Sequence, residues 1–196
     1  QAAAVREAAH LGVSFVHVPD GIYDRSKTRT NPREAEQLVE AVVARLLDPA
    51  MATKSTGVVT FSEAQQTLIE DLMDEARRRH PQIEPFFAAD APEPFFVKNL
   101  ESVQGDERDA IFFSIGYGPD KDGNFAMNFG PLNRPGGERR LNVAVTRAKE
   151  QVVVFSSIVS TQIDTGRTQA TGALHLRNFL EYAERGNAQV ARAKAV

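Results

Sequence analysis

The chain has 196 residues, of which 42% are hydrophobic and 25% charged, close to the average of soluble globular proteins. These proportions exclude a disordered chain, a collagen-like repeat and a coiled coil. No cysteine occurs, which excludes disulfides, zinc–thiolate sites, iron–sulfur clusters and thiol nucleophiles. Since the net charge is −3, any phosphate contact must come from a local cluster of basic residues.

The beginning of the chain carries no targeting signal that we recognise. The Ala-rich segment over residues 1–10 has charges where a signal peptide needs an apolar stretch. No run of the sequence approaches the roughly 18 apolar residues that span a bilayer. We expect a soluble, cytoplasmic protein without a membrane partner. We interpret the segment 1–10 as the end of a helix that begins earlier, and expect the chain to be a fragment of a longer polypeptide.

The first strand and helix are predicted from apolar patterning and a capping sequence. A strand is predicted over residues 12–19, where apolar residues follow a glycine. A helix is predicted after Asn31, which is a good N-cap residue, with Pro32 in the first helical position and Glu34 in position N3. Apolar residues recur at helical spacing up to Leu47, where the helix is expected to end.

The same order of elements repeats. A short buried strand is predicted over residues 57–61, and Ser62 is the expected N-cap of a second helix. The inner stripe of this helix is expected to comprise Leu68, Ile69, Leu72, Met73 and Ala76. A Pro-rich connection over residues 81–94 precedes two more predicted strands, over residues 95–97 and 110–115.

The last part of the chain completes an α/β pattern. Residues 116–137 are rich in Gly and Pro and are predicted to form a long surface loop. A helix is predicted from Glu138 through Ala148, followed by a strand over residues 152–155 and a last helix over residues 173–185. Strands that alternate with helices predict one α/β domain with a doubly wound, mostly parallel sheet.

Several catalytic motifs are missing from the sequence. The four histidines lack the spacing of metal ligands, and no Gly-x-Ser-x-Gly elbow is present. Asp20 has no Glu-x-Lys or Asp-x-Lys partner within reach, which disfavours a metal-dependent nuclease. Lys27-Thr28 and Lys54-Ser55 do not follow a glycine, so no loop of the form Gly-x4-Gly-Lys-Ser/Thr is present. We expect no metal site in this chain.

Two polar segments are candidates for a functional site, and the first is residues 99–109. In a doubly wound sheet, the loop that leaves the carboxyl end of a strand is where ligands bind. Gly105 allows the backbone to approach a ligand, Gln104 can donate and accept hydrogen bonds, and Glu107 can accept one from a ribose hydroxyl. The alternative is an ordinary polar turn with local ion pairs.

The second segment is strongly basic. Between Arg134 and Lys149, five basic side chains accompany only Glu138, which gives a local charge of +4. The apolar residues among them leave little room for a fully solvated helix, so Arg147 is expected to project from a buried element toward an anion. The alternative is an ion pair between Arg147 and a carboxylate of the same domain.

Taken together, these segments resemble motifs of superfamily 1 helicases. Gln-Gly-Asp-Glu-Arg-Asp over residues 104–109 resembles motif V, and Arg-Arg-Leu-Asn-Val-Ala-Val-Thr-Arg-Ala-Lys over residues 139–149 resembles motif VI. Residues 57–65 are similar to motif IV. The likeness extends over residues 13–158 and is closest to the branch that includes the helicase of nonsense-mediated mRNA decay. Residues 131–137 resemble a phrase of large bacterial proteins that join a helicase to a small C-terminal endonuclease domain.

The resemblance implies that the whole chain is one RecA-like domain, a three-layer α/β sandwich, and the second of two such domains in an ATP-dependent motor. Arg147 would be the arginine finger that reaches the γ-phosphate held by the first domain. Glu107 would hold the ribose, Gln104 and Gly105 would lie at the interdomain cleft, and Arg140 would join them in nucleotide binding. ATP and Mg²⁺ would be bound mainly by the first RecA-like domain, so we expect this chain to be inactive alone.

The resemblance also implies contacts with single-stranded DNA or RNA. Thr60 and Ser62 lie in the motif IV segment, and either hydroxyl can donate to a phosphate, while Ser62 is also a helix cap. Asn99 stands where relatives have Ser or Thr beside the nucleic-acid backbone, and it can donate the same hydrogen bond. Val103 stands where relatives have an aromatic residue. The predicted partners are therefore the strand and the first RecA-like domain of the same polypeptide.

The alternative function is a non-catalytic RecA-like scaffold or interaction module. The presence of Arg147, Glu107 and Gln104 counts against it, because a scaffold needs none of the three. A flavodoxin-like domain would require a phosphate-binding loop after its first strand, and residues 20–27 lack the necessary spacing.

Overall fold

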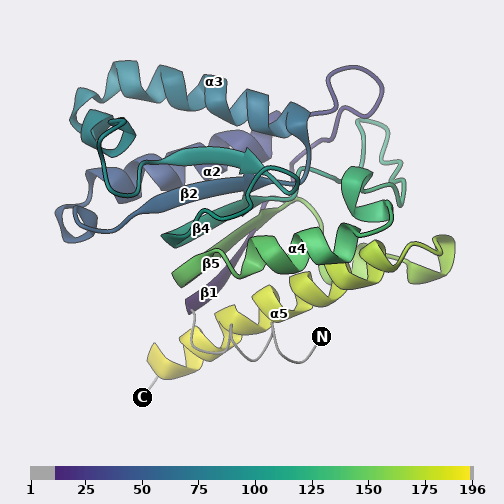
Figure 1. The fold of residues 1–196 in the computed structure, drawn as a ribbon. Coiled ribbons are helices and arrows are strands. Elements are labelled where there is room, and N and C mark those ends of the chain that lie inside the picture. Colours follow the sequence, from purple (N-terminus) through teal and green to yellow (C-terminus); the bar gives the residue numbers. More distant parts are fainter. Residues whose placement is uncertain (1–11, 195–196) are drawn as a thin grey trace.

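The computed structural model describes residues 12–194, with side chains up to residue 186, and shows one five-stranded sheet between two layers of helices (Figure 1). All strand pairs are parallel, and the strand order is β1-β5-β4-β2-β3. The strands are β1 (Gly12–His17), β2 (Thr56–Thr60), β3 (Phe96–Asn99), β4 (Arg108–Ser114) and β5 (Ala148–Ser156). The interpretation of segment 1–10 as the end of a helix lies outside the described residues.

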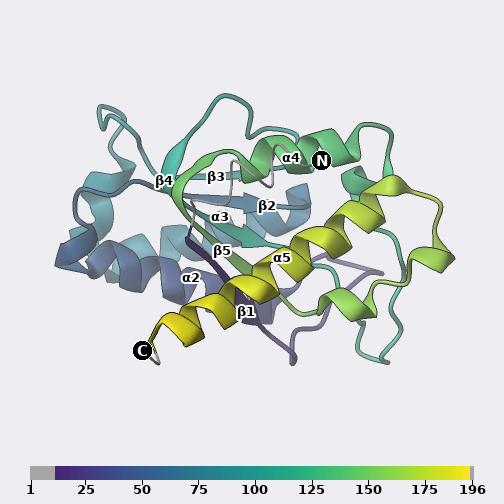
Figure 2. The ribbon, with the colours of Figure 1, turned by 90° about the horizontal axis from the view of Figure 1, so that it is seen from below.

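Helices cover both faces of the sheet, as Figures 1 and 2 show. On one face lie α2 (Pro32–Leu47) and α3 (Glu63–Arg79), and on the other α4 (Gly137–Val145) and α5 (Thr171–Lys194). Short 3₁₀ turns occur at Pro49–Met51, Pro81–Phe87, Gly130–Asn133, Ser160–Gln162 and Thr165–Arg167. The predicted α/β RecA-like architecture is confirmed. Within the described part of the chain, none of the helices combines the length and hydropathy that crossing a bilayer requires.

The central strands are buried on both faces, which explains their unbroken apolar sequences. In β5, Val152 and Val154 pack in the core beneath α4 and α5. Val153 and Phe155 pack in the second core, beneath α2 and α3. Because side chains alternate along a strand, a strand between two helical layers needs apolar residues at every position.

The two predicted N-cap residues, Asn31 and Ser62, are confirmed. The Asn31 side-chain oxygen accepts from the Glu34 backbone N–H at 3.2 Å, and the Ser62 hydroxyl accepts from the Gln65 N–H at 3.3 Å. The Glu34 carboxylate, in contrast, points into the core. It accepts from the Ser114 hydroxyl at 2.8 Å and from the Gly116 N–H at 2.7 Å, and therefore ties α2 to the end of β4.

Several predicted elements differ from the structure in their bounds, and two of the differences follow directly from tertiary packing. Residues 116–137 are not a surface loop throughout, because Phe129 and Leu132 are fully buried in the core beneath α4 and α5. The helix predicted through Ala148 ends at Val145 instead, and Ala148 begins β5. Pairing with β4 decides this boundary, since Ala148 lies opposite the first residue of that strand, a long-range contact that local patterning does not contain.

Candidate functional sites at the two edges of the sheet

The predicted site residues fall on two opposite edges of the sheet. Because all strands run in one direction, their amino ends form one edge and their carboxyl ends the other. Residues 100–107 connect the carboxyl end of β3 to the amino end of β4. The candidate segment 99–109 therefore contributes to both edges, with Asn99 at the carboxyl edge and Glu107 at the amino edge.

The amino edge brings Glu107 and Arg147 together. The backbone N–H of Arg108 donates to the carbonyl oxygen of Arg147 at 3.0 Å, so the residues that precede β4 and β5 are neighbours. The Arg147 guanidinium lies against the last turn of α4, where it donates to the Val143 carbonyl at 3.2 Å and to the Thr146 hydroxyl at 3.1 Å. A cation is favourable at the carboxyl end of a helix.

Arg147 keeps hydrogen-bonding capacity for a ligand. Its guanidinium has five N–H donors, and the two bonds to α4 use only part of them. None of the ion pairs within residues 12–186 includes Arg147. The alternative of an ion pair with a carboxylate of the same domain is thus not what the structure shows.

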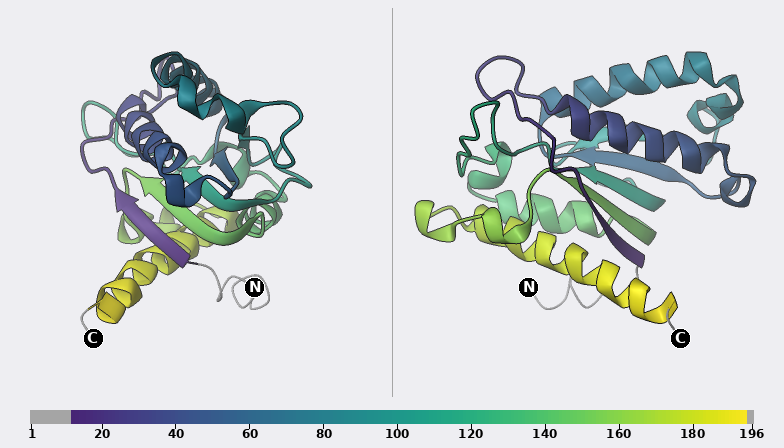
Figure 3. Two further views of the ribbon diagram at one scale, coloured as in Figure 1. Left: turned by 90° about the vertical axis from the view of Figure 1, so that its left-hand side faces the viewer. Right: turned by 180° about the vertical axis from the view of Figure 1, so that it is seen from behind.

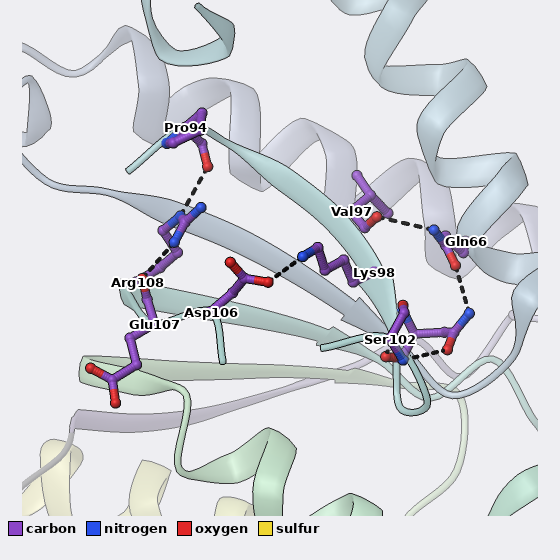
Figure 4. A network of polar contacts seen from close by, with 9 residues as sticks. Gln66, Pro94, Val97, Lys98, Ser102, Asp106, Glu107 and Arg108 are labelled. Carbon is purple, nitrogen blue, oxygen red and sulfur yellow. Dashed lines mark hydrogen bonds and ion pairs between the residues drawn. The ribbon is translucent and has the colours of Figure 1, made fainter. Parts of the chain in front are cut away.

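Arg108 fixes the backbone beside this edge (Figure 4). It is buried, donates to the Pro94 carbonyl at 2.9 Å and to the Glu107 carbonyl at 2.7 Å, and lies 4.8 Å from the ring centroid of Phe96. Sequence reasoning missed this role, because Arg108 is one of several charged residues in a polar segment. Its bonds hold Glu107 in place while leaving the Glu107 side chain exposed.

The other residues of the segment are either paired within the domain or exposed. Asp106 pairs with Lys98, and this hydrogen bond lowers the pKa of the Asp106 carboxyl. Gln104 and Gly105 are exposed. Gly105 has a φ of +82°, and a Cβ added there would meet no atom within 4 Å. The left-handed backbone conformation therefore explains the glycine, because the space around it would admit a side chain.

The basic segment after residue 134 is divided between the two edges. Arg134 lines a cleft at the carboxyl edge, whereas Lys149 follows the amino end of β5 and pairs with Glu93. Arg140 donates to the Pro135 carbonyl at 3.4 Å, near the amino end of α4, while Arg147 follows the carboxyl end of that helix. The structure therefore places Arg140 and Arg147 toward opposite ends of α4.

The carboxyl edge opens into a cleft of about 990 Å³. Ser62 and Asn99 line it, but Thr60 lies fully buried beneath and donates to the Ser62 carbonyl at 2.7 Å. The Asn99 oxygen accepts from the Ser102 N–H at 3.2 Å, and its amide donates to Gln66 at 2.7 Å, which leaves one amide N–H. Ser62 and Asn99 thus form part of the cleft wall, whereas Thr60 does not line the cleft.

Further side chains complete the cleft. Three arginines, Arg25, Arg29 and Arg134, and two partly exposed aromatic residues, Tyr23 and Phe125, lie along it, while Phe61 and Tyr117 of the lining are buried. Grooves that combine cations with aromatic rings suit single-stranded nucleic acid, because phosphates bind the cations and bases stack on the rings. Sequence reasoning missed these residues as a group, because they come from three separate connections and only the fold brings them together. Within the described residues, no three His, Asp or Glu side chains could hold a metal ion.

The chain matches one protein-family model and is similar to two known proteins. The sequence model of a family described as "AAA domain" matches residues 4–159. The chain is 36% identical, over 184 residues and 91% of its length, to an uncharacterized ATP-dependent helicase homolog of Mycoplasma pneumoniae. It is also 36% identical, over 181 residues, to an uncharacterized ATP-dependent helicase of Mycoplasma genitalium. The chain spans only 16% and 15% of these two relatives.

Proposed function

Because the chain belongs to the AAA domain family, we propose that it is the second RecA-like domain of an ATP-dependent DNA or RNA helicase or translocase of superfamily 1. Two relatives named as ATP-dependent helicases support this proposal. The observation that carries it is the position of Arg147, which lies beside the exposed Glu107 and has no carboxylate partner among the described residues.

The amino edge would contribute to the nucleotide site. The guanidinium of Arg147 would donate to oxygens of the γ-phosphate and stabilise the negative charge that develops there during hydrolysis. Glu107 would accept a hydrogen bond from the ribose, and the exposed Gln104 and Gly105 would line the interdomain cleft. When bound, ATP with Mg²⁺ supplies the phosphoanhydride that is cleaved.

The carboxyl edge would contribute to the nucleic-acid site. Ser62 and the remaining N–H of Asn99 would donate to phosphates, and the partly exposed rings of Tyr23 and Phe125 would contact bases or sugars. The two sites lie at opposite ends of the same strands. A movement of this domain toward the first domain during ATP binding would therefore also move the wall of the nucleic-acid cleft.

ATP hydrolysis by the 196-residue domain and by the full-length protein tests this proposal, with and without single-stranded DNA and RNA. We expect activity only in the full-length protein, stimulated by one of the two nucleic acids. Activity of the isolated domain would reveal a nucleotide site in this chain. Absence of activity in both proteins would favour a non-catalytic scaffold.

A further inference from the structure

The connection between β1 and α2 lies outside the helicase-like motifs but forms a wall of the carboxyl-edge cleft. Residues 24–30, which we call the basic loop, contain three basic residues and one acid in a chain whose net charge is −3. Arg25 and Arg29 of this loop line the cleft, whereas Lys27 does not. Figures 1 and 3 show the loop beside the connection that follows β4.

The basic loop is folded by its own hydrogen bonds. The Asp24 carboxylate accepts from the Lys27 and Thr28 backbone N–H groups at 3.3 and 3.1 Å and from the Thr28 hydroxyl at 3.0 Å. The bond from the Thr28 N–H is the main reason why the pKa of Asp24 is lowered. The Arg29 N–H donates to the Asp24 carbonyl at 2.7 Å, and the Asp24 N–H to the Thr30 carbonyl at 2.9 Å. The acid of the loop is thus bound to backbone rather than to the arginines.

The backbone of the loop is also unusual at Arg29. Its φ of 57° is the only positive value of a non-glycine residue in the described part of the chain. This left-handed conformation is unfavourable for a residue with a Cβ and persists only where the surrounding structure holds it. The hydrogen bonds that Asp24 accepts from Lys27, Thr28 and Arg29 provide that support, and the Arg29 side chain lines the cleft.

Carboxylates of the protein compete little with a ligand for the two arginines. No ion pair of the described residues involves Arg29. Among the described residues, the ion pair that Arg25 forms is with Asp120, at 3.8 Å, and half of the Arg25 side chain is exposed. Ser62 and Asn99 line the same cleft, so a strand bound there would meet hydroxyl and amide donors as well as the two arginines.

We propose that the basic loop binds the phosphate backbone of the strand through Arg25 and Arg29, in the same cleft that Ser62 and Asn99 line. This inference rests on the proposed function, because it adds a contact to the same nucleic-acid site. The loop would act as a preformed clamp, since its shape is set by Asp24 and needs no ordering when the strand binds.

Binding of a fluorescent single-stranded oligonucleotide by the full-length protein, measured over a range of salt concentrations, tests the inference. Each phosphate contact with single-stranded nucleic acid adds about 0.7 to the slope of log affinity against log salt. We expect Arg25→Gln and Arg29→Asn each to reduce the slope by about that amount and to weaken binding. Asn is chosen because it tolerates the left-handed conformation. Arg29→Lys, which retains the charge, should keep most of the slope.

Lys27→Gln is the matched control, because it removes the same charge from the same loop but lies outside the cleft. We expect it to bind like the unmodified protein. If Arg25→Gln and Arg29→Asn have the slope of Lys27→Gln, the basic loop is not a phosphate clamp, while the proposed function stands. If the unmodified protein binds neither DNA nor RNA strands, both proposals are wrong. Thermal unfolding of each variant shows whether a loss of binding reflects a loss of folded protein.

Discussion

The backbone N–H of Arg108 donates a hydrogen bond to the carbonyl oxygen of Arg147, at a distance of 3.0 Å. Arg108 begins β4 and Arg147 precedes β5, so this bond joins the starts of two neighbouring strands. Through it, the exposed carboxylate of Glu107 and the guanidinium of Arg147 are held at the same edge of the sheet. Two segments that are separate in the sequence therefore become one candidate site.

Arg147→Ala tests the candidate arginine finger. In the full-length protein we expect ATP turnover to fall by on the order of 10³-fold or more, because arginine fingers contribute this much to phosphoryl transfer. Nucleotide binding should remain nearly intact, since the first domain would hold most of the nucleotide. Steady-state hydrolysis and nucleotide titration measure the two effects. Arg78→Ala, which removes an exposed arginine at the end of α3, should have normal turnover. Normal turnover in Arg147→Ala would contradict the assignment.

Arg108→Ala should lower both stability and nucleotide affinity. The change leaves the carbonyls of Pro94 and Glu107 without their guanidinium donors and removes a cation from the ring of Phe96. We expect a loss of about 3 kcal/mol in the free energy of unfolding, measured by urea denaturation. In the full-length protein the KM for ATP should rise, because Glu107 loses its anchor. Arg108→Lys keeps one donor and should lose less. An unchanged urea midpoint in Arg108→Ala would show that these bonds do not stabilise the domain.

Glu34 should make stability depend on pH. Burial raises the pKa of its carboxyl from 4.5 to about 7, although hydrogen bonds from Gly116, Ser114 and Ser157 oppose the increase. The folded state therefore binds a proton more tightly than the unfolded state. Its contribution to stability is greatest below about pH 4.5 and is lost as the pH rises to about 7, by about 3 kcal/mol in total.

Urea denaturation at pH 5 and pH 8 measures this effect. Glu34→Gln is the comparison, because it removes the titrating group and leaves the other carboxylates in place. We expect the difference between the two pH values to be smaller in Glu34→Gln than in the unmodified domain. Glu34→Gln should also be less stable at pH 5. The amide NH₂ group would face the N–H and O–H donors that bind the Glu34 carboxylate in the buried site. Equal pH dependence in both proteins would show that Glu34 does not titrate in this range.

Gly57→Ala should disturb the packing of β2 against the Phe96 ring of β3. A Cβ at this position would lie 2.5 Å from the Cζ atom of the Phe96 ring, closer than two carbon atoms pack. We expect a loss of about 1–3 kcal/mol in the free energy of unfolding, the usual cost of overpacking. The double variant Gly57→Ala/Phe96→Leu should lose less than the sum of the two single changes. Gly12→Ala is the control, since its nearest contact would be an ordinary 3.7 Å. Additive losses would exclude a clash between the two side chains.

Local sequence signals determined most of the secondary structure. Asn31 and Ser62 were predicted as helix caps, and both accept the expected backbone hydrogen bonds. The apolar strands and the alternation of strands with helices were sufficient to predict a parallel α/β sheet. These features depend on residues that lie within one or two turns of each other, so they are visible without knowledge of the fold.

Tertiary structure alone decided where the functional groups lie. The sequence placed Thr60, Ser62 and Asn99 together, but burial separates Thr60 from the cleft. Neither Arg25 nor Arg29 belongs to a helicase-like motif, and they reach the cleft only because β1 and β4 end at the same edge of the sheet. The strand order and parallel direction of the sheet set these distances, and they result from packing between segments that are far apart in the chain.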